Sequence, residues 1–185
     1  MRTLVIEGMD CAGKSTLIKR IKEQYPEAKS IHFPTKEWKK EEPVTDFMAK
    51  DMRQIFDVQD TDILLLDRFW PSTMVYQFLP MWKEKSISWA VKWSSMVSFI
   101  ENILPIDAYI LCTVSFDDWM ERLDEESKDV LRTEFTNVVD TSQPREVWGL
   151  LKSAYDSLVT ANNKWIRVDT NVLSDQAIKN LMEKI

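Results

Sequence analysis

The chain has 185 residues; 44% of them are apolar, 29% are charged and only three are glycine. This composition is that of an ordinary globular domain and excludes a disordered, collagen-like or low-complexity chain. The formal net charge of −6 argues against a general nucleic-acid-binding protein, because such binding needs a broad basic face. We expect a single domain over residues 1–185.

The apolar runs and the cysteines place further limits on the class of protein. The longest apolar runs have the length of strands and fall well short of the roughly 18 residues of a membrane helix. The first residues carry neither a secretory signal pattern nor an Arg/Ser-rich presequence, so we expect no membrane association and a cytoplasmic location. Cys11 and Cys112 are far apart and too few for a disulfide framework, and we expect both to be free thiols.

Five strands are predicted in chain order. Three are continuous apolar runs, as expected for strands buried on both faces of a parallel sheet, and the second and fifth are weaker. The predicted strands are Leu4–Ile6, Ser30–Phe33, Ile63–Leu66, Tyr109–Val114 and Trp165–Val168.

Helical patterns lie between these strands. A helix follows the first strand, another begins after Pro144, and the last begins at Ser174, which has the side chain of an N-cap. A tryptophan-rich stripe precedes the fourth strand and comprises Trp89, Trp93, Met96, Val97 and Ile100. The alternation of strand and helix predicts an α/β fold with three layers and a doubly wound, five-stranded parallel sheet. Ligands bind such sheets at the carboxyl ends of the strands.

Two of the three glycines bracket a segment that matches the Walker A pattern in full. The segment follows the first strand and opens a helix, so its backbone N–H groups and the helix N-terminus face one anion site. We expect Lys14 to reach the β and γ phosphates of ATP and Ser15 to ligate Mg²⁺. The expected ATP-binding residues are Gly8, Asp10, Cys11, Ala12, Gly13, Lys14, Ser15 and Thr16. The alternative is a tight strand-to-helix turn whose lysine is only solvated.

The third strand ends in Asp67 and Arg68. If this strand adjoins the first, both side chains lie beside the phosphate loop. Asp67 would then hold a Mg²⁺ water, and Arg68 would pair with a phosphate through two hydrogen bonds. The alternative is a surface ion pair at a strand terminus.

Three groups of residues resemble the thymidylate kinase family of P-loop kinases. They are Ile6–Thr16, Phe33-Pro34, and Asp67-Arg68-Phe69 followed by Ser72 and Tyr76-Gln77. Leu104–Asp107 before the fourth strand and Ala154-Tyr155 in a late helix also fit the family. The resemblance implies a P-loop nucleotide kinase fold with a short lid over about residues 122–145, and ATP and Mg²⁺ as cofactors.

The resemblance also implies an acceptor site. Asp10 would contact the deoxyribose 3′-hydroxyl or the acceptor phosphate region, Arg68 would bind the acceptor phosphate, and Arg53 would hydrogen-bond the pyrimidine. The other substrate-binding residues implied are Phe33, Lys36, Ser72, Tyr76 and Gln77. Alternatively, Arg53 is a solvated helix residue and Tyr76 a core aromatic.

Two departures from the family pattern concern the charges at the site. Lys36 stands where the family usually has an arginine, and lysine lacks the bidentate fork. Cys11 stands where other members have a glycine or a catalytic arginine, so the transition-state arginine has to come from the lid. The candidates are Arg122, Arg132 and Arg145. We favour Arg132 for catalysis and Arg122 for a contact with the ATP adenine.

Two further departures concern the lid and the base. Residues 124–129 are acidic for a lid. Ala49 takes the place of the aromatic residue that stacks on thymine, and Phe47 or Phe69 would have to substitute. His32, the sole histidine, we interpret as structural, because transfer to an ionised phosphate needs no imidazole base.

The leading hypothesis is an ATP-dependent kinase that converts a pyrimidine deoxynucleoside monophosphate, most simply dTMP, to the diphosphate. One alternative is a deoxynucleoside kinase, in which Glu37 and Trp38 would face a hydroxyl acceptor. Another is a kinase of a hydroxymethylated pyrimidine, free or within DNA, and a third is a nucleotide-binding regulator without turnover. The partner implied is a small-molecule nucleotide, and the resemblance implies a homodimer packed through the tryptophan-rich helix.

Overall fold

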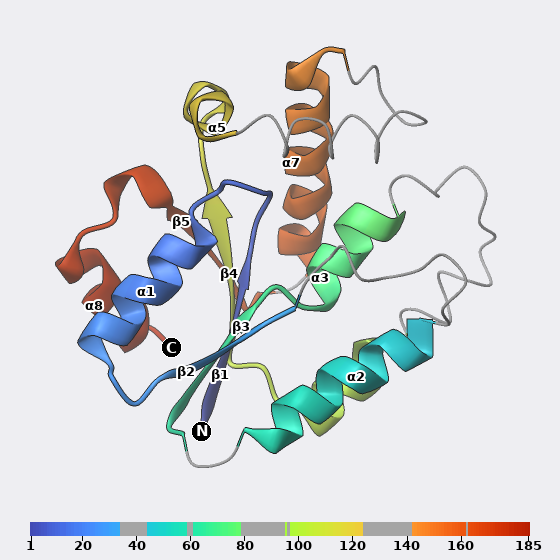
Figure 1. Cartoon of the computed structure of the whole chain (residues 1–185), viewed down its shortest axis with the longest axis vertical. Coiled ribbons are helices and arrows are strands. Elements are labelled where there is room, and N and C mark those ends of the chain that lie inside the picture. The colour runs from blue at the N-terminus through green and yellow to red at the C-terminus, as the bar shows by residue number, and fades with distance from the viewer. Residues whose placement is uncertain (34–43, 59–60, 79–94, 96, 124–141, 162) are drawn as a thin grey trace.

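The computed structural model describes residues 1–33, 44–58, 61–78, 95, 97–123, 142–161 and 163–185. Five parallel strands form one sheet in the order β2-β3-β1-β4-β5 (Figure 1). The strands are β1 Arg2–Glu7, β2 Lys29–His32, β3 Ile63–Asp67, β4 Ala108–Thr113 and β5 Trp165–Asp169. All five predicted strands are therefore present, and the predicted doubly wound α/β class is confirmed.

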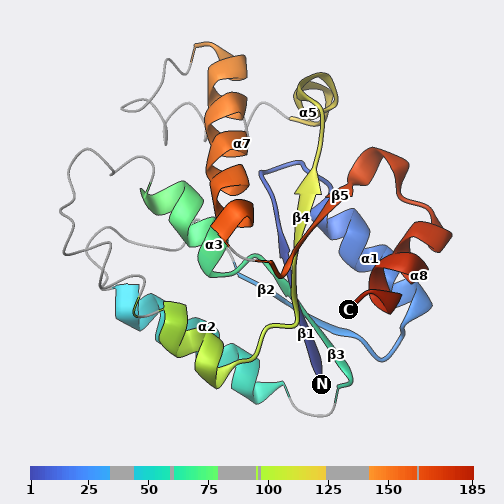
Figure 2. The same cartoon turned by 180° about the vertical axis from the view of Figure 1, so that it is seen from behind.

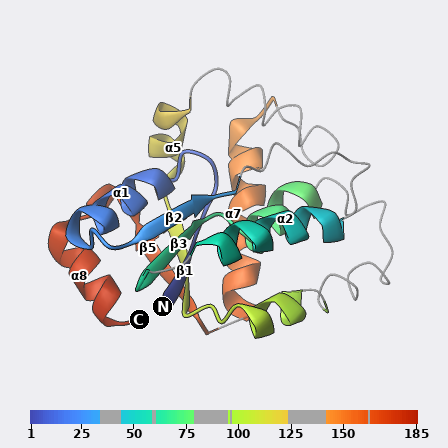
Figure 3. The same ribbon diagram turned by 60° about the horizontal axis from the view of Figure 1, so that its bottom comes forward.

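Helices cover both faces of the sheet. The helices α1 and α8 pack on one face, and α2 and the helical residues 97–103 pack on the other, as Figure 2 and Figure 3 show from two further directions. The helical elements are α1 Lys14–Gln24, α2 Val44–Asp57, α3 Trp70–Thr73, the π-helix η2 Met74–Phe78, α5 Phe116–Arg122, α7 Pro144–Ala161, the 3-10 helix η4 Thr170–Val172 and α8 Asp175–Glu183. No helix in the described ranges is long and apolar enough to cross a membrane.

The core is divided in two by the sheet. Side chains alternate along β1, so that Leu4 and Ile6 pack in the cluster with α1 and α8, while Val5 packs in the cluster with α2. Both faces of β1 are consequently buried, which is why its sequence is a continuous apolar run. On the edge strand β2 only Ile31 is buried, which accounts for the weakness of that strand's signal.

The central position of β1 places the phosphate loop at the middle of the sheet edge. β1 pairs with β3 from Arg2↔Ile63 to Ile6↔Asp67, and with β4 from Leu4↔Ala108 to Glu7↔Leu111. The third strand therefore adjoins the first, as the acceptor hypothesis requires.

Several helices match their sequence patterns and others do not. Ser174 caps α8, with its hydroxyl accepting the Ala177 N–H at 3.1 Å. The short helices α3 and α5 have no counterpart among the predicted elements. Of the tryptophan-rich stripe, Ile100 is buried in the α2 core and Val97 packs against it, while Trp89, Trp93 and Met96 lie outside the described residues, as do lid residues 124–141.

Candidate functional site

The loop between β1 and α1 has the backbone of a phosphate-binding loop. Gly8 has φ +138° and Gly13 has φ +84°. A Cβ atom on Gly8 would lie 2.6 Å from the Cys112 carbonyl oxygen, and one on Gly13 would lie 2.8 Å from the Thr170 side chain. Both positions therefore require glycine, because any side chain would be strained and would collide with a neighbour.

Lys14 opens α1 and turns back into its own loop. Its Nζ donates to the Gly8 carbonyl at 2.9 Å and to the Met9 carbonyl at 2.8 Å. Burial lowers the pKa of Lys14 to about 8, and the positive charge of Arg68 acts in the same direction. The ammonium group is thus held next to the loop, where a bound anion would stabilise its charge.

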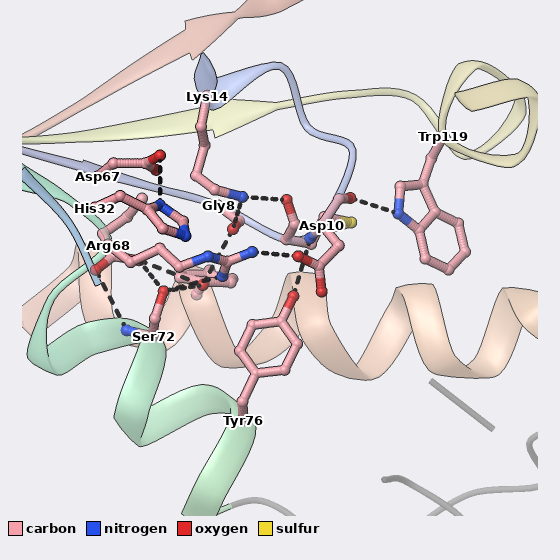
Figure 4. A network of polar contacts seen from close by, with 12 residues as sticks. Gly8, Asp10, Lys14, His32, Asp67, Arg68, Ser72, Tyr76 and Trp119 are labelled. Atoms are coloured by element: carbon pink, nitrogen blue, oxygen red, sulfur yellow. Dashed lines mark hydrogen bonds and ion pairs between the residues drawn. The ribbon is translucent and has the colours of Figure 1, made fainter. Parts of the chain in front are cut away.

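Arg68 meets Asp10 of the phosphate loop in an ion pair, drawn in Figure 4. The guanidinium also donates to the Ser72 hydroxyl at 3.3 Å and lies 5.4 Å from the centre of the Tyr76 ring. Burial disfavours the charge of Asp10, but the cations Arg68 and Lys14 hold its pKa below the usual range. Both partners are therefore ionised at neutral pH.

Asp67 ends β3 beside the phosphate loop. Its Oδ2 lies 2.8 Å from His32 Nδ1, whereas its buried Oδ1 has no hydrogen-bond partner among the described residues. An unpaired carboxylate oxygen is a costly feature unless it accepts from a water or a cation's hydration shell. The sequence alone did not place His32 at this site.

The oxygen atoms of Asp67 and Ser15 fit a magnesium ion that shares its coordination with phosphates. Both residues face the same cavity, and carboxylate and hydroxyl oxygens are hard ligands of the kind that Mg²⁺ prefers. The described residues contain no group of three or more His, Cys, Asp or Glu that would hold a metal by itself. A metal here would thus depend on substrate oxygens, which is the usual case for Mg²⁺ in phosphoryl transfer.

These side chains surround one cavity of about 530 Å³ at the carboxyl ends of the strands. It is lined by Asp10, Cys11, Gly13, Lys14, Ser15, Thr16, His32, Asp67, Arg68, Arg122 and Thr170. A second cavity of about 500 Å³ runs between α1 and β2 and shares Ser15, His32 and Asp67 with the first.

The structure brings together most of the residues expected at the donor side. Asp10, Cys11, Gly13, Lys14, Ser15, Thr16, Asp67, Arg68 and Arg122 line the cavity, and Gly8 and Ala12 belong to the loop itself.

The residues expected at the acceptor side are more dispersed. Tyr76 is buried, and its hydroxyl accepts the Asp10 N–H at 2.9 Å. Ser72 lies beneath Arg68, and Phe33 is buried against Phe69 with 5.8 Å between ring centres. Arg53 is exposed on α2 and lines neither cavity. Lys36, Arg132 and the side chain of Gln77 lie outside the described residues, so their roles stay predictions.

Helix α5 is fixed on top of the phosphate loop. Trp119 donates from Nε1 to the Asp10 carbonyl at 2.9 Å, and Arg122 contacts the Cys11 carbonyl at 3.4 Å. Arg122 also contacts Thr170, whose hydroxyl donates to the Ala12 carbonyl at 2.8 Å. Arg145, the third lid candidate, instead lies over the Phe116 ring at 4.1 Å from its centre.

Trp119 and Thr170 were missed in the sequence. No motif surrounds them, and the one available signal was their position just after the fourth and fifth strands, at the edge of the sheet where ligands bind.

Comparison with known proteins identifies the fold. No model of a known protein family matches the sequence, and no curated protein matches it either. A solved structure of deoxyadenosine kinase from M. mycoides with bound dATP matches with a TM-score of 0.58 and 16% identity, over 100% of this chain and 98% of that chain. Thymidylate kinase from Candida albicans matches with a TM-score of 0.61 and 16% identity, over 100% and 90%.

A solved structure of a different kind of kinase also matches this fold. Polyphosphate Kinase 2 from Arthrobacter aurescens TC1 matches with a TM-score of 0.65 and 17% identity, over 98% of this chain and 65% of that chain. At such identities the likeness concerns the fold, which agrees with the strand order and the phosphate loop described above. The chain therefore has the fold of the P-loop nucleoside and nucleotide kinases.

Proposed function

We propose that the protein is a kinase that transfers the γ-phosphoryl group of ATP to a pyrimidine deoxynucleoside monophosphate, most simply dTMP. The observation that carries the proposal is the convergence of Lys14, Asp67 and Arg68 on one cavity. Lys14 at the phosphate loop could bind the donor phosphates, and Arg68 across the cavity could bind the acceptor phosphate, so that the two react in line. The likeness to solved nucleoside and nucleotide kinases supports this reaction class.

In this proposal the chain acts by positioning and by neutralising charge. The loop N–H groups and the α1 N-terminus hold the donor phosphates, and Lys14 leaves the carbonyls of Gly8 and Met9 to pair with them. Arg68 orients the acceptor phosphate, whose oxygen bonds to the γ-phosphorus as the bond between the γ-phosphorus and the ADP oxygen breaks. The attacking oxygen of the acceptor phosphate is already ionised, so no side chain has to remove a proton.

Magnesium and a lid arginine complete the proposed site. Ser15 and Asp67 would hold Mg²⁺, which supplies neutralisation between the donor phosphates when bound. Arg132 is our proposed lid arginine, and arginines in that role accelerate phosphoryl transfer elsewhere by about 10³ to 10⁵. Arg122, which already lies over the Cys11 carbonyl, would face the nucleotide base.

A deoxynucleoside kinase is the second candidate, and the ion pair of Arg68 with Asp10 favours it. Because Asp10 neutralises the guanidinium, Arg68 offers less charge to an acceptor phosphate than a free arginine would. A hydroxymethylated pyrimidine acceptor and a regulator without turnover remain further alternatives from the sequence.

We also propose a homodimer. Phe99 and Ile103, on the helical residues 97–103, are 62% and 43% exposed, and Phe56 of α2 is 54% exposed. α2 and this helix pack on the same face of the sheet, as Figure 3 shows, and exposed apolar side chains on their outer surfaces are available for a protein interface. Light scattering on the purified protein tests the proposal, and a monomer at high concentration would refute it.

The function is tested by measuring ADP production from Mg-ATP with a panel of acceptors. The panel comprises dTMP, thymidine, dUMP, dCMP, 5-hydroxymethyl-dUMP and DNA containing 5-hydroxymethyluracil, with Lys14→Ala as the blank. We expect dTMP to be the best acceptor and Arg68→Ala to abolish turnover. Faster reaction of thymidine favours the nucleoside kinase, and reaction of a modified base alone changes the acceptor. ATP binding without any transfer refutes the kinase proposal.

A further inference from the structure

Glu7, the last residue of β1, has a completely buried carboxylate that accepts four hydrogen bonds. Its Oε1 accepts the Phe69 N–H at 2.8 Å and the Ser72 N–H at 3.3 Å. Its Oε2 accepts the Ser72 hydroxyl at 2.6 Å and the Tyr155 hydroxyl at 3.4 Å. Glu7 lines neither cavity at the phosphate loop. A buried carboxylate is costly, and an apolar residue would fill the same space, so packing alone does not account for it.

These hydrogen bonds hold the backbone on both sides of Arg68. Arg68 has φ +69°, a left-handed conformation that residues other than glycine adopt only when their surroundings impose it. Its own N–H donates to the Ile6 carbonyl at 2.9 Å, and the next N–H, that of Phe69, donates to Glu7. Two consecutive residues of β1 thus fix the two peptide groups that set the conformation of Arg68.

The Arg68 side chain is anchored through the same group. Ser72, which binds Glu7 through both its N–H and its hydroxyl, accepts a hydrogen bond from the Arg68 guanidinium at 3.3 Å. Arg68 and Ser72 lie together beside the phosphate loop in Figure 4. A change at Glu7 would therefore move both the backbone and the guanidinium of Arg68.

Tyr155 of α7 extends the network to the phosphate loop. Its hydroxyl lies 3.2 Å from the Ser72 hydroxyl and 3.3 Å from the Gly8 carbonyl oxygen. That carbonyl also accepts the hydrogen bond from Lys14. Glu7 is consequently linked to Lys14 through the Tyr155 hydroxyl, whose proton lies between Glu7 Oε2 and the Gly8 carbonyl, and to Arg68 through Ser72.

We propose that Glu7 is a positioning residue that sets Arg68 relative to Lys14 while contacting neither substrate. The inference rests on the proposed phosphoryl transfer, since it concerns the distance between a donor-side and an acceptor-side cation. Glu7 acts through Phe69, Ser72 and Tyr155, and its loss misplaces the acceptor more than the donor.

The protonation state of Glu7 changes the direction of these hydrogen bonds. Burial raises the pKa of Glu7 to about 7, while Ser72 and Arg68 oppose the rise. A proton on Oε2 would make Glu7 the donor to Ser72, whose hydroxyl would then turn to Tyr155. The titratable or charged groups that face Glu7 are Lys14, Arg68, Tyr109, Cys112 and Tyr155. We therefore expect the KM for the acceptor to change with pH near 7.

The kinetic test compares Glu7→Gln and Glu7→Leu with Asp107→Asn. Asp107 is the matched control, because it accepts the Thr3 N–H at 2.7 Å at the opposite end of the sheet. Glutamine keeps one acceptor oxygen, so we expect it to keep the acceptor KM within about threefold and to lose its pH dependence near 7. Leucine should raise the acceptor KM about tenfold or more and leave the KM for ATP within about threefold. Asp107→Asn should change neither constant.

Several outcomes would overturn the inference. An unchanged acceptor KM in folded Glu7→Leu does so, as does an equal rise of both KM values, which indicates a purely structural role. If Glu7→Leu does not fold, Ser72→Ala replaces it, with an expected rise of about three- to tenfold in the acceptor KM, and an unchanged value is again contradictory.

An NMR measurement separates this inference from the proposed function. The amide protons of Phe69 and Ser72 should titrate with a midpoint near pH 7 in the wild type and stay constant in Glu7→Gln. If no acceptor in the panel reacts, the proposed function fails, while the difference in these amide shifts between the wild type and Glu7→Gln still decides whether Glu7 holds this backbone. Phe69 and Ser72 amide shifts that are the same in the wild type and in Glu7→Gln at every pH would overturn the positioning network whatever the activity.

Discussion

Asp10 of the phosphate loop and Arg68 at the end of β3 form an ion pair across the candidate site. The pair joins the two loops that we propose hold the donor and the acceptor. An anion that binds Arg68 has to compete with the carboxylate of Asp10, a residue whose backbone is held by hydrogen bonds of its N–H to the Tyr76 hydroxyl and of its carbonyl to Trp119. The negative charge of Asp10 therefore lowers the affinity of Arg68 for an anion.

The first prediction concerns that competition. Asp10→Asn keeps the shape of the side chain and removes its charge, so inorganic phosphate should bind about three- to tenfold more tightly. Isothermal titration calorimetry with inorganic phosphate measures the change. The gain should disappear when Arg68→Ala is added, and weaker binding by Asp10→Asn would contradict the competition.

The second prediction concerns the pH dependence of nucleotide binding. Burial lowers the pKa of Lys14 to about 8 in the free protein, and bound phosphates would raise it by stabilising the ammonium form. Binding then takes up a proton, so the affinity for ADP should fall, by up to about tenfold per pH unit, as the pH rises above 8. Calorimetry from pH 7 to 9.5 tests this. Lys14→Met should bind weakly with no such slope, and a constant wild-type affinity would be contradictory.

The third prediction concerns stability and Glu7. Its pKa is about 7 in the folded protein against an ordinary value of 4.5, so between these pH values the folded state holds a proton that the unfolded state has released. The free energy of unfolding should thus fall as the pH rises from 4.5 to 7 and stay level above, by about 3 kcal/mol at most. Urea denaturation of the wild type and Glu7→Gln at pH 5 to 8 isolates this contribution, since glutamine does not titrate. A difference between the two proteins that does not change with pH would refute it.

The fourth prediction uses the three glycines. Gly8→Ala and Gly13→Ala should lower the free energy of unfolding by about 1–2 kcal/mol or more, because of their positive φ and their close contacts with Cys112 and Thr170. Gly149→Ala is the matched control, since it lies within α7 with open space around it. Alanine there should raise the free energy of unfolding by about 0.5–1 kcal/mol. Equal effects at all three positions, measured by urea denaturation, would be inconsistent with the loop geometry.

The fifth prediction concerns magnesium and Asp67. Asp67→Asn should increase the Mg²⁺ concentration needed for half-maximal ATP binding by about tenfold or more, because in the proposed site the Asp67 carboxylate that would face the hydrated metal loses its charge. A Mg²⁺ titration with a fluorescent ATP analogue measures it, with Asp107→Asn as the control. An unchanged Mg²⁺ requirement would remove Asp67 from the metal site.

The sequence predicted those parts of the site that lie in one continuous segment or at the end of a strongly apolar strand. Lys14 and Ser15 belong to a contiguous motif, and Arg68 follows a strand whose apolar run marks it as central. The short helices α3 and α5 were not predicted, because four and seven residues span too few turns for an apolar period to be visible.

Residues that reach the site from elsewhere in the chain could not be predicted in this way. Trp119 and Thr170 come to the phosphate loop only because β4 and β5 lie on the side of β1 away from β3. Glu7 is visible in the sequence as a carboxylate before the loop, but its burial depends on which face of β1 it occupies and on Tyr155, which is far along the chain.

The strand order also governs when the phosphate loop can form during folding. β1 is synthesised before its hydrogen-bond partners, which are β3, at Ile63–Asp67, and β4, at Ala108–Thr113. Closing such long loops costs chain entropy before the strand pairs form and stabilise the structure, and this slows folding. On the ribosome, Gly8 and Lys14 would thus remain without their final surroundings until Cys112 and then Tyr155 have emerged. The anion-binding loop after β1 is therefore completed by residues that are synthesised much later than the loop itself.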